Sequence, residues 1–419
     1  MTTTKSAAAT DVAHERRITT ALFAAGLTTF VSMYSAQALL PSLSAAFGAT
    51  PARAALAVSL TTGFLALAII PVSALSSRIG RTRVMIGSAV AAAAIGLLLP
   101  MSPSLEVLLA GRALQGIALA GVPAVAMAYL AEELGGDRLG AAMGIYVAGT
   151  TIGGLAGRLI PAFTLDLASW RWAQAAVSIA AAGCTVWFVR WLPSSRGFVP
   201  RPAGIHTVLG DLAGQLRHRG LLALFGLAFV LMGGFVSMYN YLGYRLTTGP
   251  FGLPEALAGL VFVLYLAGTA ASAMSGRLAD RVGRHWVLAA SLGVMATGLA
   301  VTIPDHLGIV ILGVLLYTAG FFGAHTAASA WVGALAEGNR GAASSLYLFA
   351  YYLGGAVIGG VAGIAYTRGG WLELTSGVGF LLVIAAMLVW ALLIHARRSV
   401  RRSETVHTDR EPEALPVES

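Results

Sequence analysis

The stretch GRLADRVGRHWV, from Gly276 to Val287, separates two long apolar segments, and a diverged copy of it occurs earlier in the chain. The copy reads SALSSRIGRTRV, from Ser73 to Val84, so that a Leu, two Arg, a Gly and a Val recur at an offset of 203 residues. A single match of this kind proves little. The question it raises is whether other segments repeat at the same interval.

Two other segments repeat in the same order. The pentapeptide FVSMY occurs at positions 30–34 and again at 235–239, an offset of 205 residues. The sequences GAAMGIY and GAASSLY begin at Gly140 and Gly341, an offset of 201 residues. The second half of the chain is therefore a diverged copy of the first. Parallel repeats of this kind are typical of secondary transporters, which hold substrate between the halves near the middle of the membrane.

The composition predicts an all-α polytopic membrane protein. The chain is 57% hydrophobic and only 11% charged, with a mean hydropathy of +0.78, whereas soluble proteins carry about 25% charged residues. Twelve apolar stretches are long enough to cross a membrane as helices, and stretches so continuously apolar are not barrel strands. We predict membrane helices at 18–40, 54–76, 84–102, 106–130, 140–162, 171–192, 221–243, 256–275, 286–303, 307–331, 341–365 and 373–395.

The longest polar interruption divides these helices into six plus six. We therefore expect two pseudo-symmetric six-helix bundles with tails and one long loop. The predicted divisions are a cytoplasmic N-tail at 1–17, a first bundle at 18–192, a cytoplasmic central loop at 193–220, a second bundle at 221–395 and a cytoplasmic C-tail at 396–419.

The charge distribution predicts how the chain lies in the membrane. The net charge is +9, but the Lys and Arg residues are concentrated in alternate loops rather than in one basic face. Positive residues mark the cytoplasmic side, so we expect a protein of the cell (inner) membrane with both termini on the cytoplasmic side. Nucleic-acid binding is not expected, because it needs a clustered basic face. Four arginines are predicted in loops on the outer side: Arg53, Arg171, Arg245 and Arg368. Arg158 is predicted at the outer end of a helix.

Three motifs make the chain resemble the major facilitator superfamily, and within it the twelve-helix drug:proton antiporters and arabinose-efflux-permease-like proteins. The loop motif G-x-L-A-D-R-x-G-R is complete at 276–284, whereas its first copy has Ser73 and Ser77 in place of Gly and Asp. The motif R-A-x-Q-G occurs at 112–116. The antiporter motif of helix five is present with Thr in place of Pro, at Gly140, Gly149, Thr150, Gly153 and Gly154.

The loop motifs are expected to act as a conformational latch. Glycine permits a tight turn between helices, and the Arg side chains can pair with carboxylates or with helix C-termini. The alternative is that these arginines only anchor the topology. The residues assigned to the latch are Arg78, Gly80, Arg81, Glu132, Glu133, Gly276, Asp280, Arg281, Gly283, Arg284 and Glu337.

Proton coupling is assigned to Arg112, Gln115 and His325. Arg112 lies inside a predicted helix, where a charge requires a partner or a wet cavity, and we expect cavity water, Gln115 and the ligand to compensate it. The alternatives are a snorkelling Arg112 and a His325 that is merely packed. All 18 Asp and Glu fall at helix ends, in loops or in tails, so the substrate is expected to be neutral or anionic.

The repeated FVSMY lies in the first and seventh helices, which line the cavity in the superfamily that the chain resembles. Aromatic walls with a few hydrogen-bonding groups suit moderately apolar organic ligands, although any one tyrosine can equally serve packing. The residues assigned to the substrate cavity are Tyr34, Gln37, Tyr146, Tyr239, Asn240, Tyr347 and Tyr351.

Together these patterns predict a secondary active transporter that exports small neutral or anionic organic molecules in exchange for protons, by alternating access. Alternatives are an uptake or sugar-type transporter of the same fold and a transport-inactive sensor or scaffold. No nucleophile–base or metal-ligand spacing indicates an enzyme, and no nucleotide-binding signature is present. The expected partners are a small-molecule substrate, protons and the lipid bilayer. No cofactor or metal is expected, and the protein is expected to be a monomer.

Overall fold

The computed structural model describes the backbone of residues 2–134, 137–200, 205–336 and 340–408, and every regular element there is helical. The first half holds α1 (Thr2–Tyr34), η1 (Gln37–Leu39), α2 (Leu40–Phe47), α3 (Pro51–Ile79), α4 (Arg81–Leu98), η2 (Leu99–Met101), α5 (Leu105–Leu119), α6 (Gly121–Glu133), α7 (Asp137–Leu165) and α8 (Trp170–Trp191). A linking helix, α9 (Ile205–Gln215), follows. The second half holds α10 (Arg219–Thr247), α11 (Glu255–Gly259), η3 (Leu260–Leu264), α12 (Tyr265–Val282), α13 (Arg284–Val301), α14 (Leu307–Leu335) and α15 (Arg340–Thr408).

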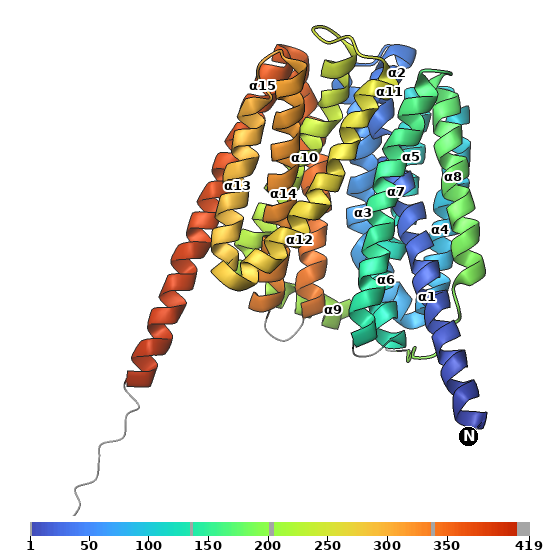
Figure 1. Ribbon diagram of the computed structural model, residues 1–419, viewed down its shortest axis with the longest axis vertical. Coiled ribbons are helices and arrows are strands. Elements are labelled where there is room, and N and C mark those ends of the chain that lie inside the picture. Colours follow the sequence, from blue (N-terminus) through green and yellow to red (C-terminus); the bar gives the residue numbers. More distant parts are fainter. Residues whose placement is uncertain (1, 135–136, 201–204, 337–339, 409–419) are drawn as a thin grey trace, which may run out of the picture.

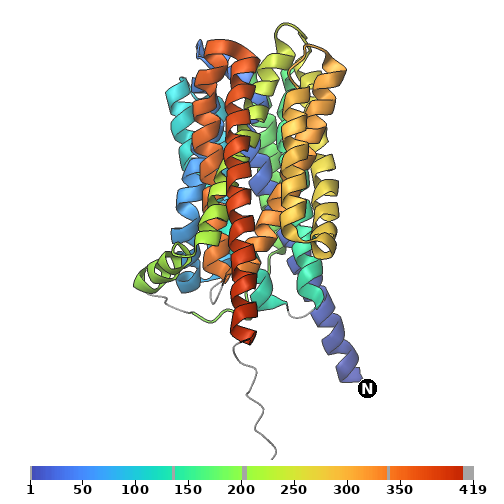
Figure 2. The same cartoon turned by 90° about the vertical axis from the view of Figure 1, so that its left-hand side faces the viewer.

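Eleven spans in the described chain are long and apolar enough to cross a membrane. The last of them, Arg340–Ile394, has 55 residues, which at 1.5 Å per residue is far longer than one crossing needs. Gly369 and Gly370 interrupt it with non-helical backbone angles, and the orange and red limbs of α15 run side by side (Figures 1 and 2). With α15 counted as two limbs, the structure confirms the predicted twelve-helix, all-α fold.

The two halves lie side by side, and the sequence repeat has a structural counterpart at the loop motifs (Figure 1). Gly80 joins α3 to α4 with φ +108°, and Gly283 joins α12 to α13 with φ +96°. Side chains rarely adopt such angles because Cβ clashes with the backbone. The two motif glycines therefore make the same tight turn between consecutive helices, as the sequence predicted.

Helix α1 ends earlier than the apolar pattern suggested. The predicted span 18–40 covers the end of α1, a break at residues 35–36, and the whole of η1. Ser35 donates a hydrogen bond to the carbonyl of Ser32, 3.0 Å away, and so satisfies one of the carbonyls that a helix end leaves without a partner. The break is apolar on both sides, so hydropathy alone does not reveal it.

The halves are joined at the end of the molecule that holds α2 and α11, which we call the tied end (Figure 1). There α7 packs on α11, and α3 packs along α15 from Ala52, which faces Gly363, to Gly63, which faces Ala356. The Tyr244 hydroxyl donates to the Leu40 carbonyl at 2.8 Å and lies 2.6 Å from the Ser44 hydroxyl. Ser42 donates to Glu255 at 3.3 Å. The opposite end carries the N-terminus and α9, and among the described residues no hydrogen bond joins the halves there. The structure is thus a conformation closed at the tied end.

Candidate functional site

A cavity of about 120 Å³ lies between the two halves, close to the tied end. Helices α1 and α7 of the first half and α10, α12, α14 and α15 of the second half contribute to its wall. Half of the lining residues are aromatic and one is charged: Phe30, Tyr34, Thr150, Thr151, Gly154, Arg158, Met232, Phe235, Val236, Tyr265, Phe322 and Tyr351. A concave aromatic site with few polar groups, shared by two bundles, fits a small-molecule site.

The charged group is Arg158 of α7, of which only 3% is exposed. Its Nε donates to the Gln37 Oε1 atom at 2.7 Å, Nη1 to the Gly154 carbonyl at 2.7 Å, and Nη2 to the Tyr265 hydroxyl at 3.2 Å. The centre of the guanidinium lies 4.2 Å from the Tyr34 ring and 4.4 Å from the Tyr265 ring. One arginine thus contacts both halves of the protein, through hydrogen bonds and cation–π contacts.

The position of Arg158 corrects the expectation that it is an outer-side topology charge at a helix end. Arg245 is likewise buried, with 4% of its surface exposed. It donates to the carbonyls of Thr302, Ile303 and Pro304 and to Asp305, at 2.8 Å. Both arginines turn inward because each finds acceptors inside the protein, which a charge count by loop does not reveal.

Gln37 and Asn240, which the sequence assigned to the cavity, do not line it but extend the hydrogen bonds of Arg158 to the second half. The Gln37 amide nitrogen donates to the Asn240 Oδ1 atom at 2.8 Å, while its oxygen accepts from Arg158. Arg158, Gln37 and Asn240 therefore form one hydrogen-bonded chain that crosses from α7 through η1 to α10. The Asn240 Nδ2 atom is buried with no hydrogen-bond partner in the structure.

Arg112, the residue first expected to face cavity water, is enclosed instead. Only 1% of it is exposed, and it does not line the cavity. It donates to Ala57 O at 3.0 Å, Ser32 O at 3.0 Å, Met33 O at 2.8 Å, Ser35 Oγ at 3.2 Å and Gln115 Oε1 at 2.6 Å. Backbone carbonyls at the C-terminal end of α1, together with α3, compensate the charge. This arrangement replaces the expected compensation by water and ligand, because a helix C-terminus favours a cation.

His325 lies one ring behind the cavity wall. Its Nδ1 is 3.0 Å from the Tyr347 hydroxyl, and its ring stacks on Phe321 and lies 4.7 Å from the ring of Tyr351, which lines the cavity. His325 therefore contacts two tyrosines of α15: Tyr351, which lines the cavity, and Tyr347, which binds its ring nitrogen. Arg112 and Gln115 lie together in the first half and are not part of this cluster.

The tyrosines that the sequence assigned to the cavity separate into two groups. Tyr34 and Tyr351 line it directly. Tyr146 is buried within the first half. Tyr239 lies behind the wall, with its hydroxyl 2.6 Å from Thr318 Oγ1. Besides Arg158, sequence reasoning missed Tyr265 in this wall, whose hydroxyl accepts a hydrogen bond from Arg158.

The loop motifs make contacts within a half and not between halves. Arg81 donates to Glu132 at 2.9 Å and to Ser76 at 2.6 Å. Glu133 accepts from Ser195 and from the backbone of Arg196, at 2.7 Å. Within the described chain, four further motif residues form no ion pair: Arg78, Asp280, Arg281 and Arg284. Gly276 has open space beside it, and Glu337 lies outside the described residues. In this conformation the latch assignment has no contact between the halves to support it.

The glycines of the helix-five motif divide between two faces of α7. A Cβ at Gly149 or Gly153 would meet the α1 backbone at Phe23 or Leu27, so these glycines allow α7 and α1 to pack closely. Thr150 and Gly154 are on the cavity side. Gly140 has open space around it. Arg158 follows Thr150 and Gly154 at four-residue spacing and shares their face, which is the sequence signal that could have found it.

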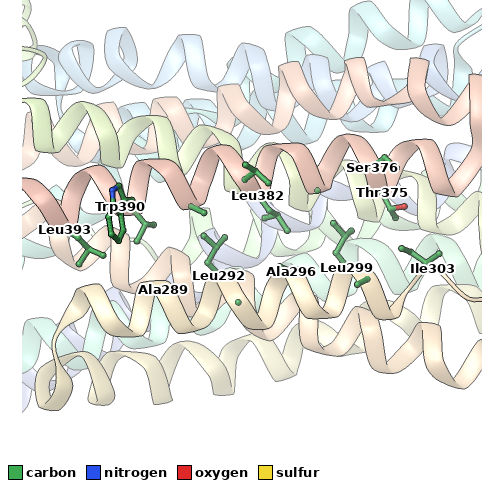
Figure 3. A pocket seen from close by; sticks show the side chains of 16 residues that line it. Ala289, Leu292, Ala296, Leu299, Ile303, Thr375, Ser376, Leu382, Trp390 and Leu393 are labelled. Atoms are coloured by element: carbon green, nitrogen blue, oxygen red, sulfur yellow. The ribbon is translucent and has the colours of Figure 1, made fainter.

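A larger groove of about 650 Å³ lies at the periphery, between α13 and the second limb of α15 (Figure 3). Its wall is apolar apart from Thr375 and Ser376, and Leu292, Leu299 and Leu382 project into it (Figure 3). In a membrane-spanning chain such a face meets lipid. It offers no group that would orient a polar substrate, so the central cavity is the better candidate despite its smaller volume.

The comparisons with known proteins agree with this architecture. The "Uncharacterized MFS-type transporter YybF" of Bacillus subtilis (strain 168) is 37% identical over 389 residues, covering 93% of this chain and 96% of that protein. The "Inner membrane transport protein YnfM" of Escherichia coli (strain K12) is 42% identical over 381 residues, covering 91% and 90%. A crystal structure of a peptide transporter POT in complex with sulfate is similar in fold alone, with a TM-score of 0.74, 14% identity and coverage of 91% and 94%.

These similar proteins are named as transporters, which confirms that the chain is not an enzyme. The family model described as Major Facilitator Superfamily matches residues 22–248 and 241–417. Together with the repeated halves, the shared central cavity and the two relatives, this match shows that the chain belongs to the Major Facilitator Superfamily of membrane transporters.

Proposed function

We propose that this chain is a secondary active transporter that carries small neutral or anionic organic molecules through the cavity between its halves by alternating access. One observation carries the proposal: the cavity is lined from both halves, and as far as the described residues extend, the halves are hydrogen-bonded to each other only at the tied end, at Arg158 and between Gln37 and Asn240. Rocking of one bundle against the other would therefore break few bonds and would expose the same site to the other side.

We further propose that transport is efflux in exchange for protons. Of the residues expected to couple protons, His325 is the one whose position suits the role, because its ring contacts Tyr351 in the cavity wall and an imidazole can both bind and release a proton. Arg112 and Gln115 would then support coupling only indirectly, by holding α1, α3 and α5 together.

Purified protein in proteoliposomes tests this function. We expect counterflow of at least one small organic compound, and its accumulation when a pH gradient is imposed. His325→Asn should retain counterflow and lose accumulation, whereas His306→Asn, an exposed histidine just before α14, should behave as wild type. Absence of flux for every compound in a broad library would contradict transport. Gradient-driven accumulation by His325→Asn would contradict its role in coupling.

We also propose that both termini lie in the cytoplasm, so that the tied end faces outward. In a Cys184→Ser background, Thr248→Cys at the tied end should react with a membrane-impermeant thiol reagent in intact cells. Ser194→Cys, in the loop after α8, should react only after lysis. Both positions are exposed in the structure. The reverse labelling pattern would overturn the orientation.

A further inference from the structure

We propose that the central cavity takes a small organic anion, and that the guanidinium of Arg158 binds its carboxylate. This inference rests on the proposed transport function and narrows it, since it decides between the neutral and anionic substrates that the sequence left open. It is carried by the burial of Arg158, by its neutral partners and by the size and wall of the cavity.

Arg158 is almost fully buried, yet its hydrogen-bond acceptors are an amide, a carbonyl and a phenol, all neutral. In the described chain no carboxylate forms an ion pair with it. The buried Arg245, by contrast, has Asp305 at 2.8 Å. A buried charge is costly unless it is paired, so Arg158 offers a place where an incoming anion gains more than a neutral molecule would.

Arg158 is held mainly by side chains, whereas Arg112 is held mainly by backbone. Arg112 is fixed mainly by backbone carbonyls, which cannot leave. Two of the three acceptors of Arg158 are side chains, those of Gln37 and Tyr265, and a side chain can rotate away. Three hydrogen bonds also leave two of the five guanidinium N–H groups without a described partner. The N–H edge of Arg158 can therefore be released to a carboxylate, which matches its fork geometry.

The hydrogen-bonded chain that begins at Arg158 ends at a donor without a partner. The Asn240 Nδ2 atom is buried and has no partner, although Asn240 Oδ1 accepts from Gln37. Leaving a buried donor unsatisfied costs about 1–3 kcal/mol. When a ligand carboxylate takes Arg158, Gln37 Oε1 loses its donor, and rotation of Gln37 can bring that oxygen toward Asn240. The chain from Arg158 to Asn240 thus has a way to absorb the loss of the Gln37 contact.

The volume and the wall of the cavity limit the size of the ligand. The cavity measures about 120 Å³, and an engineered cavity of about 150 Å³ in another protein holds benzene. Phe30, Phe235 and Phe322 contribute apolar rings to the wall. In this conformation the site suits a carboxylate with a short apolar or single-ring body rather than a drug-sized molecule.

Binding measurements on the full chain in detergent at pH 7 test the inference. The probes are benzoate and benzamide, which share shape and differ in charge. We expect benzoate, and not benzamide, to bind by calorimetry and to raise the melting temperature. Arg158→Gln should weaken benzoate binding by roughly 10- to 100-fold, because a charge-assisted hydrogen bond is lost. Arg171→Gln, which removes an exposed arginine beside Trp170, is the matched control and should change it less than twofold.

Two further arms separate the possible failures. Arg158→Lys keeps the charge but not the fork, so intermediate binding is expected, and this variant serves if Arg158→Gln does not fold. Three results would overturn the inference: equal binding of benzoate and benzamide, binding of neither probe by the wild type, or full benzoate affinity in Arg158→Gln or, if that variant does not fold, in Arg158→Lys. In proteoliposomes, benzoate binding without counterflow would refute the transport function and leave the anion site standing. Counterflow of neutral compounds alone would refute the anion site and leave transport standing.

Discussion

Replacing Arg112 by Met should destabilise the protein rather than only uncouple transport. The guanidinium joins three helices of the first half, through carbonyls near the end of α1, the Ala57 carbonyl in α3 and Gln115 in α5. Without it, the C-terminal end of α1 loses the cation that satisfies its carbonyls. The sequence analysis had instead expected cavity water, Gln115 and the ligand to compensate this charge.

The magnitude follows from which acceptors lose their only donor. The Ser32 carbonyl keeps the Ser35 hydroxyl, and the Ala57 carbonyl keeps the Thr61 hydroxyl. Met33 O and Gln115 Oε1 have no other described donor. Two unsatisfied buried acceptors cost about 2–6 kcal/mol together, and removing a buried charge returns part of this. We expect a net loss of about 2–4 kcal/mol and, for a chain of 419 residues, a fall in melting temperature of roughly 2–5 °C.

The assay is thermal denaturation of the purified protein in detergent, with Arg171→Gln as the control that removes an arginine from an exposed site. The double variant Arg112→Met/Gln115→Leu should recover part of the loss, because removing both partners leaves fewer orphaned groups. A melting temperature within about 1 °C of wild type, with gradient-driven flux lost and counterflow retained, would refute this reasoning. Arg112 would then act in coupling, as the family resemblance implied.

Three other perturbations follow from the contacts. Gly153→Ala should destabilise the first half by about 1–3 kcal/mol, because its Cβ would lie 2.7 Å from the Leu27 carbonyl; Gly144→Ala, with open space around it, should not, and equal melting temperatures would contradict the packing. Tyr244→Phe removes the hydroxyl that joins the halves and should speed hydrogen exchange in α2 and α11; unchanged exchange would show that this bond does not hold the tied end. Asp280→Asn should slow turnover more than Ser77→Ala at unchanged melting temperature, because only the second loop motif retains its anion; equal and mild effects would mean that neither loop gates.

The sequence predicted the helices, the two halves and the turn glycines because each depends on local composition. An apolar run of about 20 residues has few alternatives to a membrane helix, and a glycine between two such runs supplies the positive φ that the turn needs. The end of α1 was not predictable in this way. It depends on Arg112, which comes from α5 and caps the helix across a sequence distance of 79 residues.

The candidate site was predicted less well, because the decisive quantity is the face that each helix presents. Arg158 near the end of a predicted span is equally consistent with snorkelling to the membrane surface and with turning inward. Neighbouring residues show the same limit. Glu132 and Glu133 are adjacent in sequence, but one binds Arg81 and the other binds the loop after α8. Successive helical residues point about 100° apart, so neighbours in sequence need not share a partner.

The two buried arginines of the first half together indicate how the site is organised. Arg112 is held by backbone of the same half, and its bonds survive any rigid movement of one bundle against the other. Arg158 is held partly by Tyr265 of the other half and by Gln37, which in turn binds Asn240. Its bonds must therefore change when the bundles move. A ligand that competes for Arg158 alters the free energy of one conformation more than the other, and differential affinity of this kind is what a ligand needs to shift a conformational equilibrium.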